Sequence, residues 1–143
     1  EIARRQKLQA LRRLEPFCPD SKIETVELDS PGKGTLLLVQ AECEQATATC
    51  FALGALGKRA ERVADEAVEE LLAFLETGAA IDQHLADQLV LPLAFANGPS
   101  RYKTASITRH LLTQAMLVPM FLKVAVQIEG EEDRPGLVNI LPG

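Results

Sequence analysis

The second half of the chain contains a histidine whose position suits phosphate chemistry. His110 follows Thr108, a good helix N-cap, and therefore lies in the first turn of an expected helix. Unpaired backbone N–H groups and the positive end of the helix dipole meet at such a turn, which favours a neutral imidazole and attracts anions. A neutral ring nitrogen there could attack a nucleotide phosphate. The simpler alternative is a buried histidine that makes one hydrogen bond.

A second polar group precedes this helix in the sequence. His84, Asp87 and Gln88 lie on another expected helix, which Asp82 can cap. Taken alone, they are most simply three exposed polar residues on an amphipathic helix. Position and residue type favour the simpler interpretation both here and at His110.

Two sequence blocks change this assessment because they resemble a known family. One reads HLADQ at 84–88, and the other reads SITRHLLTQ at 106–114. RNA 3′-terminal phosphate cyclases have an HLADQ segment and a later HLLTN-type segment at about this separation. Further agreement lies at 57–61, 78–80 and 92–94, and the resemblance is firmest from 54 to 122. Gln114 stands where the family more often has Asn, and Pro119 lies inside a helix where the family usually has no proline.

The resemblance implies a ligase-type, ATP-dependent enzyme of RNA processing. His110 would attack the α-phosphate of ATP and carry AMP, which would pass to an RNA 3′-phosphate before closure to a 2′,3′-cyclic phosphate. The HLADQ segment would contact ATP, and its members are His84, Leu85, Ala86, Asp87 and Gln88. A divalent metal, Mg²⁺ or Mn²⁺, would arrive with the nucleotide, and we expect no metal site made by protein ligands. The alternative is a non-catalytic cyclase-like module in RNA processing or assembly, and His110 favours the enzyme.

Length and composition limit the number of domains, the class of partner and the cellular compartment. The 143 residues fit one domain or two small ones, and 47% hydrophobic residues suffice for a core. The net charge of −5 argues against general coating of nucleic acid, although it says little about a local groove. Cys18, Cys43 and Cys50 lack paired metal spacing and are interpreted as reduced thiols. Without a membrane span or leader in the sequence, we expect a soluble, cytoplasmic protein.

The first half predicts a helix, a short strand, a two-stranded hairpin and a second helix. A helix ends near Pro16, a short strand at 22–28 precedes a hairpin of 35–42 with 47–53, and a helix covers about 60–77. Gly78 would stop that helix. The apolar residues that can share a face of the first helix are Ile2, Ala3, Leu8, Leu11 and Leu14. The simpler interpretation of its basic residues is a solvated face, and the alternative is an RNA contact: Arg4, Arg5, Lys7, Arg12 and Arg13.

The second half predicts helix, strand, helix, strand and strand. The expected ranges are a helix at 82–96 bent by Pro92, a strand at 101–107, the His110 helix, and strands at 123–129 and 137–141. Arg101, Lys103 and Arg109 bring three cations close to His110 in the sequence. They are either a local positive field for phosphates or ordinary surface residues.

The expected fold is α/β with layers of the α+β type, in which helices pack on mixed or antiparallel sheets in two small units. By resemblance, residues 1–79 would be part of the small inserted domain of a cyclase, and 80–143 the last repeat of its larger catalytic domain. Because the cyclases are longer, the chain is expected to be a C-terminal portion whose partner is the missing N-terminal part. Unpaired strand edges would also let it associate with itself, and we expect no membrane partner.

Overall fold

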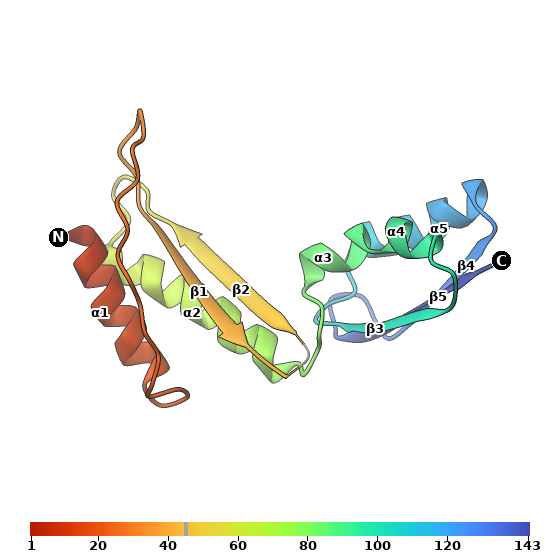
Figure 1. The fold of residues 1–143 in the computed structure, drawn as a ribbon, viewed down its shortest axis with the longest axis horizontal. Helices are drawn as coiled ribbons and strands as arrows, with labels where there is room; N and C mark the ends of the chain where they lie inside the picture. The colour runs from red at the N-terminus through yellow and green to blue at the C-terminus, as the bar shows by residue number, and fades with distance from the viewer. Residues whose placement is uncertain (45) are drawn as a thin grey trace. The chain divides into compact units, whose positions relative to one another are not determined.

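The computed structural model describes residues 1–44 and 46–143, which form two compact units (Figure 1). The first unit covers Glu1–Ala73 and the second covers Phe74–Gly143. Each is a set of helices packed on an antiparallel sheet, so the α/β class with α+β layers expected from the sequence is confirmed. Among the described residues, every helix is too short or too polar to cross a bilayer.

The first unit has the order helix, strand, strand, helix. Its elements are α1 (Ile2–Leu14), β1 (Leu36–Glu42), β2 (Thr47–Leu53) and α2 (Ala60–Glu76), the last of which ends just inside the second unit. The two strands pair antiparallel from Leu36↔Leu53 to Glu42↔Thr47, as the hairpin prediction required. Gly78 stands at φ +58°, a left-handed conformation that glycine adopts readily and that stops α2 as predicted.

The core of the first unit is built from small and branched side chains. Alternation along the hairpin buries one face and leaves the other to solvent, and α2 buries an apolar stripe of helical period. The buried residues are Leu37, Val39, Ala48 and Ala52 from the hairpin, and Ala60, Val63, Ala64, Ala67, Val68 and Leu71 from α2. On α1 the buried residues are Gln6, Ala10 and Leu14, at a spacing of four.

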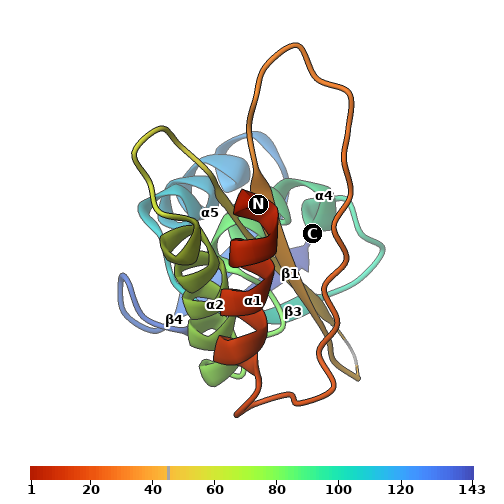
Figure 2. The same cartoon turned by 90° about the vertical axis from the view of Figure 1, so that its left-hand side faces the viewer.

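Ion pairs join the two helices of this unit, which lie side by side in Figure 2. Arg5 donates two hydrogen bonds of 2.9 Å to the carboxylate of Glu61, and Arg13 Nη2 lies 3.1 Å from Glu69. The hydrogen bonds from Arg5 lower the pKa of Glu61. Part of the basic face of α1 therefore contacts acids of α2, whereas Arg4 and Arg12 are exposed.

Two predictions for the first unit differ from the structure. The predicted apolar face of α1 is only partly buried, because Leu14 is buried whereas Ile2 and Leu8 are both more than half exposed. The stretch 22–28 is not a strand. A strand requires a partner for its backbone groups, and β1 pairs only with β2 among the described residues. The side chains of Val26 and Leu28 are consequently 72% and 83% exposed.

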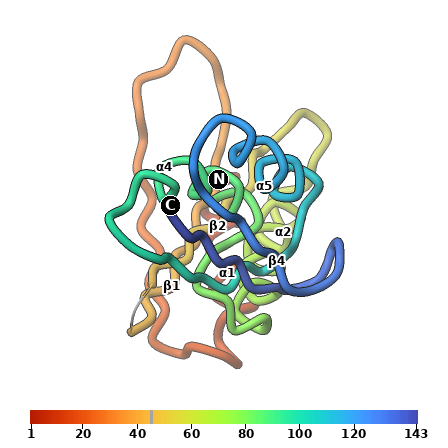
Figure 3. The backbone as a smooth tube through the Cα atoms, turned by 90° about the vertical axis from the view of Figure 1, so that its right-hand side faces the viewer, coloured from red at the N-terminus to blue at the C-terminus, as the bar shows by residue number. Residues whose placement is uncertain are grey.

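The second unit packs helices on a three-stranded sheet. Its elements are α3 (Gln83–Gln88), α4 (Val90–Ala94), β3 (Ser100–Thr104), α5 (Arg109–Phe121), β4 (Val124–Glu129) and β5 (Gly136–Pro142). The strand order is β3-β5-β4, with both pairs antiparallel. Figure 3 follows the chain from β4 into β5 along the blue part of the tube. Parallel bridges at Ile81↔Thr104 and Ile107↔Glu132 attach the segments that precede α3 and α5.

Two elements in this unit have bounds that differ from the sequence prediction. The expected helix at 82–96 is divided into α3 and α4 at Leu89. Pro92 accounts for the position of the break, because it has no N–H for the carbonyl of Gln88 and its ring crowds that carbonyl. The strand expected at 101–107 ends at Thr104. Pro119 lies inside α5, and the helix continues beyond it to Phe121.

One apolar cluster holds the helices of the second unit against the inner face of the sheet. It contains Ala86 of α3, Val90 and Ala94 of α4, Leu111 and Val118 of α5, Val138 and Ile140 of β5, and Ile107. Ala86, Val90, Leu111, Val138 and Ile140 have no exposed surface. The cluster therefore determines where α3 lies relative to the start of α5.

Candidate functional site

His110 lies in the first turn of α5, as predicted. The side chain of Thr108 caps the helix and accepts a hydrogen bond of 3.2 Å from the backbone N–H of Leu111. The imidazole is exposed and makes no hydrogen bond with any part of the chain that the structure describes. The alternative of a buried, hydrogen-bonded histidine is therefore wrong, and both ring nitrogens are accessible to a ligand.

The HLADQ segment forms α3, and its N-terminus is capped from within the chain. Asp82 Oδ1 accepts hydrogen bonds from the backbone N–H groups of His84 (2.7 Å) and Leu85 (2.8 Å). Gln88 Nε2 donates to the carbonyl of His84 at 2.9 Å. The cap at Asp82 begins the helix and the turn at Leu89 ends it, so these residues form a short helix of about one and a half turns.

The five residues of this segment differ in exposure. His84, Leu85 and Gln88 are exposed, Asp87 is half-buried, and Ala86 is fully buried in the core. The side chains of His84, Leu85 and Gln88 are thus accessible to a ligand, and that of Asp87 is partly accessible. Ala86 can offer a ligand only its backbone.

Packing brings α3 next to α5. Ala86 and Leu111 belong to the same buried cluster, and the two helices contact each other directly. Asp87 follows Ala86 and His110 precedes Leu111 in the sequence, so the half-buried carboxylate and the exposed imidazole belong to the two helices that this packing joins. Residues more than 20 positions apart in the sequence therefore lie on helices that contact each other.

The three cations near His110 in sequence have different environments. Arg109 Nε donates a hydrogen bond of 2.6 Å to Glu132, and this bond raises the pKa of Arg109. Lys103 Nζ donates to the carbonyl of Thr77 at 2.7 Å. Arg101 is exposed. Because Glu132 neutralises much of the charge of Arg109, the local positive field is weaker than the sequence indicates.

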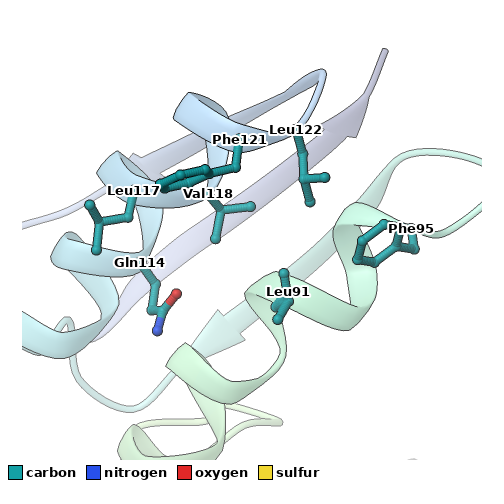
Figure 4. Close-up of a pocket in the computed structure, with 7 residues that line it drawn as sticks. All are labelled: Leu91, Phe95, Gln114, Leu117, Val118, Phe121 and Leu122. Carbon is teal, nitrogen blue, oxygen red and sulfur yellow. The ribbon is translucent and has the colours of Figure 1, made fainter.

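A hollow of about 330 Å³ lies between α4 and α5, shown in Figure 4. Its lining is Leu91 of α4, Phe95 directly after α4, Gln114, Leu117, Val118 and Phe121 of α5, and Leu122. Gln114, which lies one helical turn after His110, contributes the one side-chain amide of the lining, and the other lining side chains are apolar. The hollow contains no group that could transfer a proton or hold a metal, so it can offer a ligand only apolar contact and one amide.

Comparison with known proteins assigns the chain to a family. The model of the family described as "RNA 3'-terminal phosphate cyclase (RTC), insert domain" matches residues 1–76, which is more than half of the chain. The chain belongs to the RNA 3′-terminal phosphate cyclase family. The matched region includes all four elements of the first unit.

Curated relatives extend the similarity into the second unit. The RNA 3'-terminal phosphate cyclase of Ectopseudomonas mendocina is 38% identical over 143 residues, which are 99% of this chain and 41% of that protein. The cyclase of Thermococcus onnurineus is 42% identical over 98% of this chain and 41% of its own length. That of Methylococcus capsulatus is 43% identical over 82% of this chain and 33% of its own. The chain thus spans about two fifths of the length of the cyclases that it matches.

A metal site built from protein ligands does not fit this surface. Within 1–44 and 46–143, no group of three or more His, Cys, Asp or Glu side chains could hold an ion. Asp87 is the one acid of α3, and a single carboxylate can add one oxygen ligand to a metal that reaches the site on a phosphate.

The sequence reasoning missed Tyr102, which contacts the HLADQ segment of this cyclase chain. Its hydroxyl donates a hydrogen bond of 2.6 Å to the carbonyl of Ala86. A usable signal was present, because Tyr102 is the only tyrosine in the chain and alternates with Thr104 on the inward face of β3. The partner of its hydroxyl could not be read from that pattern.

Proposed function

We propose that this chain forms the C-terminal portion of an ATP-dependent RNA 3′-terminal phosphate cyclase and supplies its nucleophile, His110. The observation that carries the proposal is the exposed, unbonded imidazole in the capped first turn of α5, beside the HLADQ segment. Membership of the cyclase family supports the same reaction. Residues 1–79 would be part of the inserted domain and residues 80–143 the last repeat of the catalytic domain.

The reaction would begin with a bond between His110 and the nucleotide. A ring nitrogen attacks the α-phosphorus of ATP, the bond from that phosphorus to the bridging oxygen breaks, and diphosphate leaves. An oxygen of the RNA 3′-phosphate then attacks the same phosphorus and releases the imidazole. Finally the neighbouring 2′-hydroxyl attacks the activated 3′-phosphate, loses its proton, and expels AMP as the 2′,3′-cyclic phosphate closes.

The environment of His110 supports the first step. Backbone N–H groups at the start of α5 point out of the helix, and together with the helix dipole they favour a phosphate next to the imidazole. His84, Leu85, Ala86, Asp87 and Gln88 would bind ATP from α3, with Ala86 contributing only backbone. Asp87 would orient either the imidazole or the metal that accompanies the triphosphate.

The first prediction is that His110→Asn removes covalent labelling of the full-length protein by ATP labelled in its α-phosphate. A phosphoramidate is labile in acid and stable in alkali, so the wild-type label should be lost in acid only. Asn keeps a polar side chain at an exposed position, and the variant should therefore fold normally. His84→Asn is the matched control, and it should keep the label at a lower level. Label that persists in the His110 variant, or that is found on lysine, would refute the assignment of the nucleophile.

The competing proposal is a non-catalytic module that assembles with other RNA-processing components. It predicts RNA or protein binding without labelling by ATP in the wild-type protein. The same labelling assay therefore separates the two functions. The exposed His110 favours the enzyme, because an inert module has no need of an accessible imidazole at a capped helix start.

A further inference from the structure

We propose that Tyr102 is a positioning residue of the nucleotide site, which holds α3 in place through a hydrogen bond from its hydroxyl to the carbonyl of Ala86. The inference rests on the proposed function, since it takes α3 as the segment that contacts ATP. It concerns a residue outside both the HLADQ segment and the His110 turn. Tyr102 would act on the reaction only through Asp87 and its neighbours.

The geometry of the contact supports a fixing role. Tyr102 belongs to β3 and pairs in register with Val138 of the central strand β5, so its backbone is held by the sheet. Its ring packs against the buried cluster of the second unit. From this rigid base the hydroxyl reaches α3 and makes a hydrogen bond of 2.6 Å to Ala86. The contact joins residues 16 positions apart and spans from sheet to helix.

The acceptor lies where a helix needs an external partner. Ala86 is in the last turn of α3, and the last carbonyls of a helix have no partner within it. Asp82 satisfies N–H groups at the start of α3, and Tyr102 satisfies a carbonyl near its end. A helix of six residues has little stability of its own, so these two contacts and the buried methyl of Ala86 determine its position.

Asp87 is close enough to the tyrosine for their charges to interact. Burial raises the pKa of Tyr102 to about 12, with a smaller contribution from the negative charge of Asp87. The hydroxyl therefore remains protonated, and can donate its hydrogen bond, over the whole pH range in which proteins normally act. A displaced α3 would move the Asp87 carboxylate relative to His110, and small misplacements of aligned groups can slow a reaction considerably.

The test is Tyr102→Phe, which removes the hydroxyl and keeps the ring. Two quantities are measured on the full-length protein: hydrogen exchange of the α3 amides, and the maximal rate of single-turnover adenylation at saturating ATP. We expect faster exchange in α3 with unchanged exchange in β4 and β5, and a maximal rate lower by about fivefold, the factor that one ordinary hydrogen bond supplies. The ATP concentration for half-maximal rate should change less than the rate itself.

Thr77→Val is the matched control. Thr77 Oγ1 also donates to a helix carbonyl, that of Phe74 at 2.6 Å, but at the end of α2. This variant should lose comparable stability and adenylate at the wild-type rate. A merely structural role for Tyr102 predicts that Tyr102→Phe behaves like this control, and that result would overturn the inference.

Failure of the two proposals can be distinguished. If wild-type protein is not adenylated, the proposed function fails, and hydrogen exchange alone then decides whether Tyr102 fixes α3. Unchanged α3 exchange in Tyr102→Phe would refute positioning even if His110 proves to be the nucleophile. Faster α3 exchange together with a lower adenylation rate supports both.

Discussion

At the scale of single residues, the site depends on the contrast between an exposed imidazole and a half-buried carboxylate. His110 makes no hydrogen bond with the described chain and is available to a ligand, whereas Asp87 is half-buried and its charge raises the pKa of Tyr102. A free nucleophile requires accessibility, and an orienting group requires a restricted position. The two side chains therefore have the environments that their proposed roles need.

The second prediction is that Asp87→Ala lowers the rate of adenylation by about tenfold in the full-length protein while the fold is kept. Removing a carboxylate without an ion-pair partner should change the free energy of unfolding by no more than about 0.5 kcal/mol. Loss of alignment of ATP, or of its metal, should slow the reaction. Glu131→Ala, at an exposed acid in the turn between β4 and β5, is the control and should adenylate normally. A normal rate for Asp87→Ala would make Asp87 a surface residue without function.

The third prediction concerns the ionisation of Tyr102. Its pKa is raised from 10.0 to about 12, chiefly by burial. A raised folded pKa contributes stability that is complete below the unfolded value and is lost as pH rises through the folded value. Stability of the second unit should thus be constant up to about pH 10 and fall between about pH 10 and pH 12. Tyrosinate absorbance of the 143-residue chain follows this directly, because Tyr102 is its only tyrosine and it has no tryptophan. A midpoint near 10 would contradict the buried environment.

At the scale of elements, the start of α5 is held by backbone contacts of the segment before it. Ile107, which is almost fully buried, donates its N–H to the carbonyl of Arg134 at 2.8 Å and accepts from the N–H of Asp133 at 2.9 Å. Its side chain fills the space left by Gly136 at the start of β5. The turn between β4 and β5 therefore determines where the capped helix that carries His110 begins.

The fourth prediction tests this arrangement with Gly136→Ala. An added Cβ would overlap the end of the Ile107 side chain, lie 2.7 Å from its Cγ1, and lie 2.8 Å from the backbone oxygen of Glu129. Since the backbone oxygen cannot rotate away, the free energy of unfolding should fall by about 1–3 kcal/mol. Denaturant titration followed by Tyr102 fluorescence reports on the unit concerned. Gly98→Ala is the control, because no atom lies within 4 Å of its added Cβ. Equal free energies of unfolding of the two variants would show that the Ile107 side chain moves aside without loss of stability.

At the scale of the whole chain, the described residues leave much apolar surface open. Large apolar side chains are exposed on α4, just after it and on α5: Leu91, Phe95, Met116, Leu117, Met120 and Phe121. Four of them line the hollow, namely Leu91, Phe95, Leu117 and Phe121. The two methionines are each 74% exposed and Phe121 is 81% exposed. An apolar surface of this kind is unfavourable in water and favours association with another chain.

The fifth prediction is that the isolated 143-residue chain binds ATP poorly, does not cyclise RNA, and associates with itself as concentration rises. Sedimentation velocity measures the association, and the double variant Met120→Gln, Phe121→Lys should reduce it. Leu56→Gln, at a fully exposed side chain in the first unit, should leave it unchanged. A chain that stays monomeric at all concentrations would show that this apolar surface is tolerated in water.

Local interactions explain how much of the site the sequence predicted. Thr108 as N-cap, His110 in the first turn, Asp82 as cap of α3 and Gly78 as the end of α2 all depend on neighbours within four residues. Such contacts are made between neighbours in the sequence and need no distant partner, so residue types at short spacing were sufficient to predict them. The antiparallel hairpin was likewise predicted from two apolar runs joined by a short connection.

Only the tertiary structure decided the properties that depend on distant partners. Among the described residues, the stretch 22–28 has the alternation of a strand but no strand to pair with. Helix α1 buries Gln6, Ala10 and Leu14, although Ile2 and Leu8 are as apolar as Leu14 and remain exposed. The exposure of His110, the neutralisation of Arg109 by Glu132 and the bond from Tyr102 to Ala86 depend on groups 16 or more residues away, or on the packing of α3 against α5. Their free energies are set by burial and distance, which residue spacing along the chain does not contain.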